Sequence, residues 1–176
     1  MAAHAQGRVR PFDPTVPKGP LLRVLDRAAQ LRPATWFLVN VGGRIDPVLM
    51  KLSSGRIRST VTAPTVLLSN RGARSGKLRQ TPLGYFTDGD DVILIASKGG
   101  DPRHPAWFHN VVANPDVELT TGHGDGGPYR ARVATGAERE RLWRLATTLY
   151  SGYDDYRRRA GGREIPVVVC SPRSGG

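Results

Sequence analysis

Residues 65–97 read TVLLSNRGARSGKLRQTPLGYFTDGDDVILIAS, and this stretch decides the fold. It contains three runs of strand type, at Thr65 to Ser69, Gln80 to Thr87 and Val92 to Ser97, separated by polar turns that contain glycine. The segment Asp88 to Asp91 forms a short hairpin turn, because Asp-Gly tolerates the positive φ angles that tight hairpins need. The stretch therefore predicts a β-meander.

The sequence after this meander predicts three more strands and two helices. In chain order we expect a helix begun by Pro105 and ended by Asn114 and Pro115, a hairpin of Val117 to Thr121 and Tyr129 to Thr135, a helix begun by a capping box of Thr135 and Glu138 that buries Leu142, Leu145, Ala146 and Leu149, and a strand from Ile165 to Cys170. Because strands and helices do not alternate regularly, six short strands favour an antiparallel barrel over a doubly wound sheet.

The N-terminal part of the chain differs from the rest. Residues 1–20 contain four prolines and no hydrophobic period, so they predict a flexible basic arm with little order. A single domain over residues 21–176 follows, since this length suits one core. Its first elements are amphipathic helices at Leu21 to Leu31 and Ala34 to Leu52. These helices either cover one end of the barrel or lie on a membrane that holds a lipid-soluble substrate.

The chain is strongly basic, with 26 Lys and Arg against 15 Asp and Glu and a formal net charge of +11. Anionic partners are therefore expected, and a nucleic acid, a phosphorylated cofactor or an acidic membrane would each fit. No apolar segment approaches the length of a membrane span, which favours the cytoplasm or a peripheral position at the inner face of the cell membrane. Cys170 is the only cysteine and fits a buried strand position. We expect no metal site.

Two cationic turns stand out. Residues 71–79 lie between two predicted strands and hold four cations and two glycines, while Ser97 to Gly100 follow the next strand. Glycine lets backbone amides approach an anion, and arginine offers paired donors to phosphate or carboxylate. A solvated basic hairpin is the alternative interpretation of the first turn. A shared anion site at one rim of the barrel would explain both turns.

Several motifs occur in the same order and spacing as in a known family. They are RSGKLRQTPL at 74–83, DGD at 88–90, ASKGG at 96–100, PAWFHN at 105–110, ANPDV at 113–117, YSGYDDY at 150–156 and IPVVVC at 165–170. Together they resemble the deazaflavin (F420)-dependent nitroreductase and quinone reductase family, which is actinobacterial. The resemblance implies a split β-barrel of the FMN-binding type, the cofactor F420, and a quinone or nitroaromatic acceptor. The phosphate and oligoglutamate tail of F420 would account for the positive charge.

The resemblance also implies site residues. The cofactor would be bound by Arg74, Ser75, Arg79, Thr81, Pro82, Ser97, Lys98, Gly99, Trp107 and Asn110. In this set Arg74 and Arg79 would hold the phosphate and tail, and Trp107 and Asn110 would wall the cofactor groove. Gly84 departs from relatives that carry a bulky residue there, which predicts a more open ring pocket.

Reduction of a quinone or nitroaromatic places negative charge on oxygen, which a hydroxyl group can stabilise or protonate. The catalytic candidates are Tyr150, Tyr153, Tyr156 and Ser97. Two tyrosines spaced by three residues can meet one ligand, and all three can do so only around a bend, which Gly152 permits. We favour Tyr150 and Tyr153 as substrate-facing, and core packing is the alternative.

Two other functions fit the same barrel. An FMN-dependent oxidoreductase is the runner-up, because a flavin phosphate needs similar cations. A nucleic-acid-binding module would need aromatic residues interleaved with the cations on the strands. Only Tyr85 and Phe86 meet this condition near the basic turn, so we expect no nucleic-acid partner. The natural acceptor and the oligomeric state stay open at this point.

Overall fold

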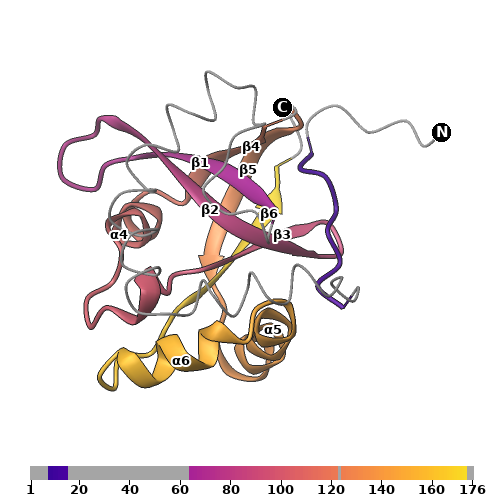
Figure 1. Ribbon diagram of the computed structural model, residues 1–176. Coiled ribbons are helices and arrows are strands. Elements are labelled where there is room, and N and C mark those ends of the chain that lie inside the picture. The colour runs from indigo at the N-terminus through magenta and orange to yellow at the C-terminus, as the bar shows by residue number, and fades with distance from the viewer. Residues whose placement is uncertain (1–7, 16–63, 123, 174–176) are drawn as a thin grey trace.

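The computed structural model describes residues 8–15, 64–122 and 124–173 of the chain (Figure 1). Within these residues, six antiparallel strands close into a barrel in the order β1-β2-β3-β6-β5-β4. The elements are β1 (Thr65–Arg71), β2 (Leu78–Asp88), β3 (Asp91–Ile95), the short 3-10 helix η2 (Lys98–Gly100), α4 (Ala106–Ala113), β4 (Asp116–Thr121), β5 (Gly126–Val133), α5 (Gly136–Leu149), α6 (Gly152–Arg159) and β6 (Val167–Pro172). The predicted α+β class, with a six-stranded antiparallel barrel and flanking helices, is confirmed.

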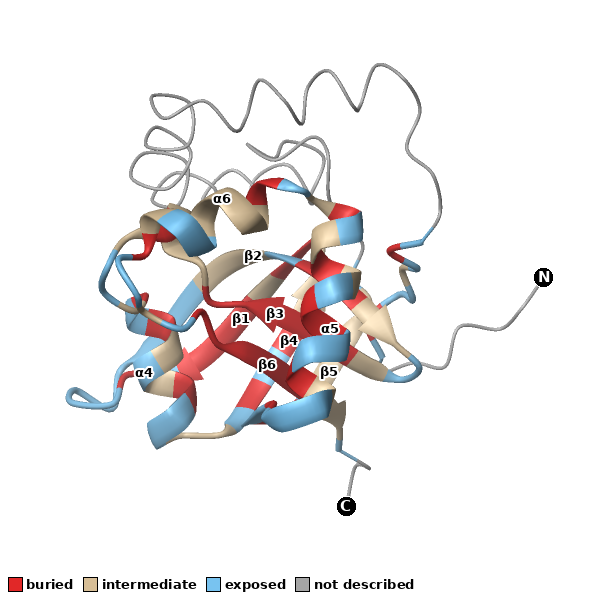
Figure 2. Cartoon of the chain, turned by 90° about the horizontal axis from the view of Figure 1, so that it is seen from below, coloured by how far each residue is buried: buried red, intermediate tan, exposed pale blue. Residues whose placement is uncertain are grey.

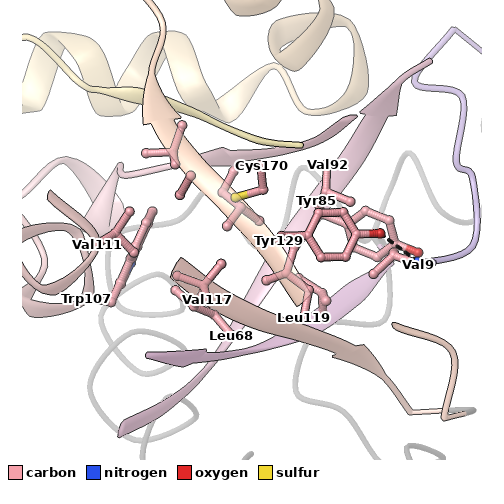
Figure 3. Close-up of a cluster of buried hydrophobic side chains, with 14 of the residues drawn as sticks. Val9, Leu68, Tyr85, Val92, Trp107, Val111, Val117, Leu119, Tyr129 and Cys170 are labelled. Carbon is pink, nitrogen blue, oxygen red and sulfur yellow. Dashed lines mark hydrogen bonds between the residues drawn. The ribbon is translucent and has the colours of Figure 1, made fainter. Parts of the chain in front are cut away.

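Strand alternation divides the apolar side chains into two cores. Along β3, Val92 and Leu94 belong to the cluster inside the barrel, whereas Ile93 and Ile95 belong to a second cluster outside it. This follows from the period of two, which sends successive side chains to opposite faces of a strand. The inner cluster also contains Cys170, which is fully buried as expected (Figure 3). Burial raises the pKa of its thiol to about 12.

Helices α5 and α6 cover the outer cluster. The face of α5 that packs on the barrel carries Leu142, Ala146 and Leu149, all buried as predicted, together with Trp143 (Figure 2). The predicted capping box is wrong, because the Thr135 side chain makes no capping hydrogen bond although Thr135 occupies the N-cap position. The Glu138 carboxylate instead forms a paired contact with the Arg132 guanidinium at 2.6 and 2.7 Å.

Strand boundaries differ from the sequence expectation by a few residues. The first hairpin is tighter than expected, because β1 runs on to Arg71 and β2 begins at Leu78. Strand β3 ends at Ile95, which leaves Ser97 in the following turn. Strand β5 begins at Gly126, inside the glycine-rich stretch that was expected to be loop. Backbone pairing with β4 extends this hairpin without needing apolar side chains.

Residues 8–15 pack along the barrel. Val9 is buried, and its amide donates a hydrogen bond of 2.8 Å to the Tyr129 hydroxyl (Figure 3). The Phe12 amide donates to Thr87 Oγ1 at 2.9 Å, and the Thr87 amide donates to the Phe12 carbonyl at 3.0 Å. The expectation of little order therefore does not match these residues, because burial of an apolar side chain and backbone hydrogen bonds fix them to the barrel.

The two predicted N-terminal helices, at 21–31 and 34–52, lie outside the described residues, so their membrane role stays a prediction. Among the helices that the structure describes, none has both the length and the apolar character needed to cross a bilayer.

Candidate functional site

The first part of the site is the arginine turn, which we define as residues 71–79. Its tip is closed by two backbone hydrogen bonds, from the Gly72 amide to the Lys77 carbonyl at 2.9 Å and from the Gly76 amide to the Gly72 carbonyl at 2.8 Å. Arg74, Lys77 and Arg79 are exposed, and within the described part of the chain none of them forms an ion pair. Exposed, uncompensated cations on a fixed turn suit an anionic ligand.

Helix α4 fixes the arginine turn from below. The Asn110 side-chain oxygen accepts a hydrogen bond of 2.9 Å from the Ala73 amide. Asn114 donates from its side chain to the Arg71 carbonyl at 3.3 Å. Asn110 was predicted to wall the cofactor groove, and the structure shows that its amide oxygen is already used to hold the turn.

Trp107 occupies a different place from the one expected. Its indole is only 7% exposed and lies in the inner core beside Val111 (Figure 3). Its carbonyl accepts a hydrogen bond of 3.3 Å from the Asn70 side chain of β1. A side chain buried in the barrel cannot wall a groove, so the predicted contact with the cofactor does not fit. Trp107 instead anchors α4 to the end of the barrel.

The second part of the site is the lysine turn, which we define as residues 97–101. Ser97 has right-handed helical angles (φ −74°, ψ −41°), whereas Lys98 has φ +49° and Gly99 has φ +65°. A right-handed residue followed by a left-handed one directs successive amide N–H groups into a concavity that binds anions. Among the described residues Lys98 is the only one besides glycine with positive φ, and such outliers concentrate at functional sites.

The two turns lie at the same end of the barrel. Both views show the hairpin between β1 and β2, helix α4 and helix α6 along one side of the molecule (Figures 1 and 2). The lysine turn joins β3 to α4 in the chain and packs against α6, because a Cβ on Gly100 would lie 2.8 Å from the Tyr156 carbonyl oxygen. The arrangement agrees with the expected single site for an anion, with α4 between its two halves.

Thr81 and Pro82 lie on β2 beyond the arginine turn, and both are partly exposed. By alternation, Thr81 shares a face with Tyr85 of the inner core, whereas Pro82 shares a face with Phe86 of the outer core. A flat ring on one face of β2 would therefore contact one of these side chains and only the backbone of the other.

The three predicted tyrosines form one cluster. Tyr150 is the C-cap of α5, and Tyr153 and Tyr156 lie on α6. Their ring centroids lie 5.4, 5.8 and 6.0 Å apart. The chain bends between the helices at Gly152, where an added Cβ would collide with the Tyr150 ring. The expected bend is confirmed, and it brings all three rings together.

The tyrosines differ in environment. The hydroxyl groups of Tyr150 and Tyr156 lie 3.1 Å apart. Tyr153 packs against Trp143 at 6.1 Å between ring centroids, and burial raises the pKa of Tyr153 above its usual value, with Tyr156 adding to the effect. Of the favoured pair, Tyr150 has its hydroxyl in a partly buried pair with Tyr156, whereas Tyr153 fits the core-packing alternative better.

Sequence reasoning missed Arg163. Its guanidinium donates to backbone carbonyls on both sides of the lysine turn, including the Ser97 carbonyl at 2.9 Å and the Asp101 carbonyl at 3.0 Å. A charged residue that directly follows Gly161 and Gly162 was a weak signal, since a solvated loop would have the same composition.

Comparison with known proteins agrees with this geometry. Residues 44–172 match the model of a family described as F420H(2)-dependent quinone reductase. The chain belongs to this family. An F420H(2)-dependent quinone reductase of Mycobacterium tuberculosis (strain ATCC 25618 / H37Rv) is 37% identical over 134 residues, which are 74% of this chain and 89% of that protein. The family resemblance inferred from the sequence motifs is confirmed.

Two solved structures also resemble the chain. One, described as an F420-H2 dependent reductase, is 41% identical with a TM-score of 0.56 and covers 61% of this chain and 94% of its own. The other, described as a domain-swapped dimer, is 35% identical with a TM-score of 0.59 and covers 73% of this chain and 94% of its own. The expected split β-barrel is thereby confirmed, and F420 is the cofactor for which the family is named.

Proposed function

We propose that this chain transfers a hydride from reduced F420 to a quinone. The observation that carries the proposal is the placement of the arginine turn and the lysine turn at one end of the barrel, on either side of α4 and next to the tyrosines of α6. Membership of the F420H(2)-dependent quinone reductase family supports it. The family also favours F420 over FMN, the runner-up inferred from the sequence.

The donor set fits a polyanionic cofactor. Arg74 and Arg79 are exposed guanidinium groups that can bind carboxylates or a phosphate in a bidentate manner, and Ser75 adds a hydroxyl on the same turn. The amide concavity at Ser97 to Gly99, with the Lys98 ammonium beside it, suits a phosphate. The assignment of the glutamate tail to the arginine turn and of the phosphate to the lysine turn is part of the proposal.

The cofactor supplies the hydride, and the protein supplies orientation and charge. A quinone that accepts a hydride develops negative charge on an oxygen atom, which a phenol can stabilise by donating a hydrogen bond or a proton. Tyr150 is the proposed donor, and Tyr156, at 3.1 Å, is placed to hold its hydroxyl and pass on a proton. Because burial raises the pKa of Tyr153, that residue keeps its proton at neutral pH and helps to pack the pair. Ser97 stays a second candidate.

The wider function extends beyond these contacts. A nitroaromatic acceptor would use the same proton donor, and the family name favours the quinone. A menaquinone-like acceptor and a peripheral membrane contact belong together, because a lipid-soluble quinone resides in the bilayer. A cytoplasmic location, with or without that contact, is proposed on the same reasoning. The relative described as a domain-swapped dimer makes a dimer the first oligomeric state to test.

Titration of the purified chain with F420 and with FMN, followed by fluorescence, tests the cofactor. We expect quenching on addition of F420 and much weaker binding of FMN. Oxidation of F420H2 by menadione, a soluble quinone, then tests the reaction through the return of the visible absorbance of F420. Tight binding of FMN with none of F420 would overturn the proposal.

A further inference from the structure

Arg163 lies in the loop between α6 and β6 and makes four polar contacts around the lysine turn. Its Nε donates to the Asp101 carbonyl at 3.0 Å, its Nη2 to the Ser97 carbonyl at 2.9 Å, and its Nη1 to the Ala96 carbonyl at 3.3 Å. Nη1 also lies 3.1 Å from Nδ1 of His104. A guanidinium has five N–H groups, so nearly all of its donors point at this one turn.

No carboxylate accounts for this position. Arg163 forms no ion pair with any acidic residue among those that the structure describes. The nearby Asp101 carboxylate instead contacts Lys98 Nζ at 3.3 Å and Arg103 Nε at 3.6 Å. Arg163 therefore binds the backbone of the turn, and its planar fork matches carbonyls that point in different directions.

Backbone geometry brings the two segments together. Gly161 and Gly162 have φ values of +64° and +86°, which reverse the chain after α6 and direct Arg163 back toward the turn. On the other side, Gly100 (φ +83°) packs closely against the Tyr156 backbone. Arg163 thus ties the lysine turn to the end of the helix that carries Tyr156.

We propose that Arg163 is a positioning residue that holds the lysine turn in the shape that binds the anionic part of F420. This inference rests on the proposed function. Lys98 has a left-handed backbone, which an L-residue adopts only when its surroundings enforce it. The Arg163 hydrogen bonds hold the carbonyls of Ala96 and Ser97 before Lys98 and that of Asp101 after it. Without them the turn would spend part of its time in other shapes, and apparent affinity falls with the fraction of molecules in the competent shape.

Charge and general stability are the two competing explanations. If Arg163 acted through its positive charge, lysine would replace it, because lysine keeps the charge and loses the planar fork. If it served only the stability of the fold, substitution would lower the unfolding midpoint without changing affinity well below that midpoint. Arg163→Lys is therefore the informative variant, and Arg163→Gln removes both charge and fork.

The experiment uses the full chain. F420 affinity is measured by fluorescence titration at a temperature well below unfolding, and amide hydrogen exchange at residues 97–101 is measured without F420. We expect Arg163→Lys to weaken F420 binding about tenfold, which corresponds to a competent fraction near one tenth, and to speed exchange in the turn. Arg103→Ala is the matched control, since it removes an exposed arginine that contacts the Asp101 carboxylate and not the backbone.

The outcomes separate the inference from the function on which it rests. An F420 affinity of Arg163→Lys equal to that of the unchanged chain, with unchanged exchange, would overturn the positioning role and leave the proposed function standing. Equal loss of affinity in Arg103→Ala and Arg163→Lys would assign the effect to charge and also overturn it. If the unchanged chain did not bind F420, the proposed function would fail first and the inference with it.

Discussion

The hydroxyl groups of Tyr150 and Tyr156 lie 3.1 Å apart although a helix boundary separates the two residues. Tyr150 ends α5, and the turn at Gly152 sends α6 back across it, so the two phenols meet. A phenol whose hydroxyl is held by a second phenol has a defined direction for proton donation. This relationship makes Tyr150 the first residue to test.

Tyr150→Phe should lower kcat for quinone reduction by about 100-fold, the lower range for loss of a general acid. Affinity for F420 should change little, because the cationic turns stay intact. Steady-state kinetics with menadione and a nitroaromatic acceptor measure the effect. Tyr153→Phe is the matched control and should retain most activity, since that ring packs against Trp143. Unchanged turnover in both variants, with both acceptors, would rule out the tyrosines as acids.

Arg74→Gln and Arg79→Gln should each weaken F420 binding by about tenfold, since a hydrogen bond to a charged group contributes about 1.5–3 kcal/mol. The affinity of the unchanged chain should fall as salt rises, and less steeply in the variants. Arg158→Gln, on α6, serves as the control because it removes an equally exposed guanidinium that already pairs with Asp155. If the control lost as much affinity as the turn variants, the tail would not be bound by the arginine turn.

Gly100→Ala should separate the lysine turn from α6. The added Cβ would lie 2.8 Å from the Tyr156 carbonyl oxygen and from Arg159 Cβ, and Gly100 has φ +83°. We expect a loss of about 2 kcal/mol in the free energy of unfolding, together with weaker F420 binding. Gly89→Ala is the control, because Gly89 has φ +61° and open space around its Cβ position. Equal losses in both variants, measured by urea unfolding, would show that backbone strain alone is responsible.

His104 gives the fold a pH dependence. Burial lowers the pKa of His104 below its usual value of 6.5, and the positive charge of Arg163 and the neighbouring His109 add to the shift. The unfolded chain therefore binds a proton at a higher pH than the folded chain does. The stability contributed by neutral His104 is complete above pH 6.5 and is lost as the pH falls through the folded value.

Urea unfolding at pH 7.5 and at pH 5 measures this effect. His104→Gln should lose less stability between the two pH values than the unchanged chain, because glutamine does not titrate in this range. Identical losses in the two proteins would mean that other groups cause the pH dependence.

The barrel could be predicted from sequence because its strands are local patterns. The alternation in residues 65–97 and the apolar run before Cys170 each report which side chains are buried, and a strand of period two uses that information directly. The family motifs added the cofactor and the site residues, because their order and spacing are visible without coordinates. The bend at Gly152 could be expected for the same reason.

Tertiary structure alone decided how distant residues share their contacts. Trp107 reads as a surface aromatic in a short helix, yet it fills the barrel end because α4 folds under β1. Glu138 fits a capping box, but an arginine across the chain offers its carboxylate a stronger, paired contact. Arg163 is 65 residues from Lys98 in the chain, and no local pattern announces hydrogen bonds to carbonyls that only the closed barrel brings within reach. Sequence thus determined which segments become strands and helices, since that depends on neighbouring residues, whereas the partners of each polar side chain depended on where the folded chain placed the available donors and acceptors.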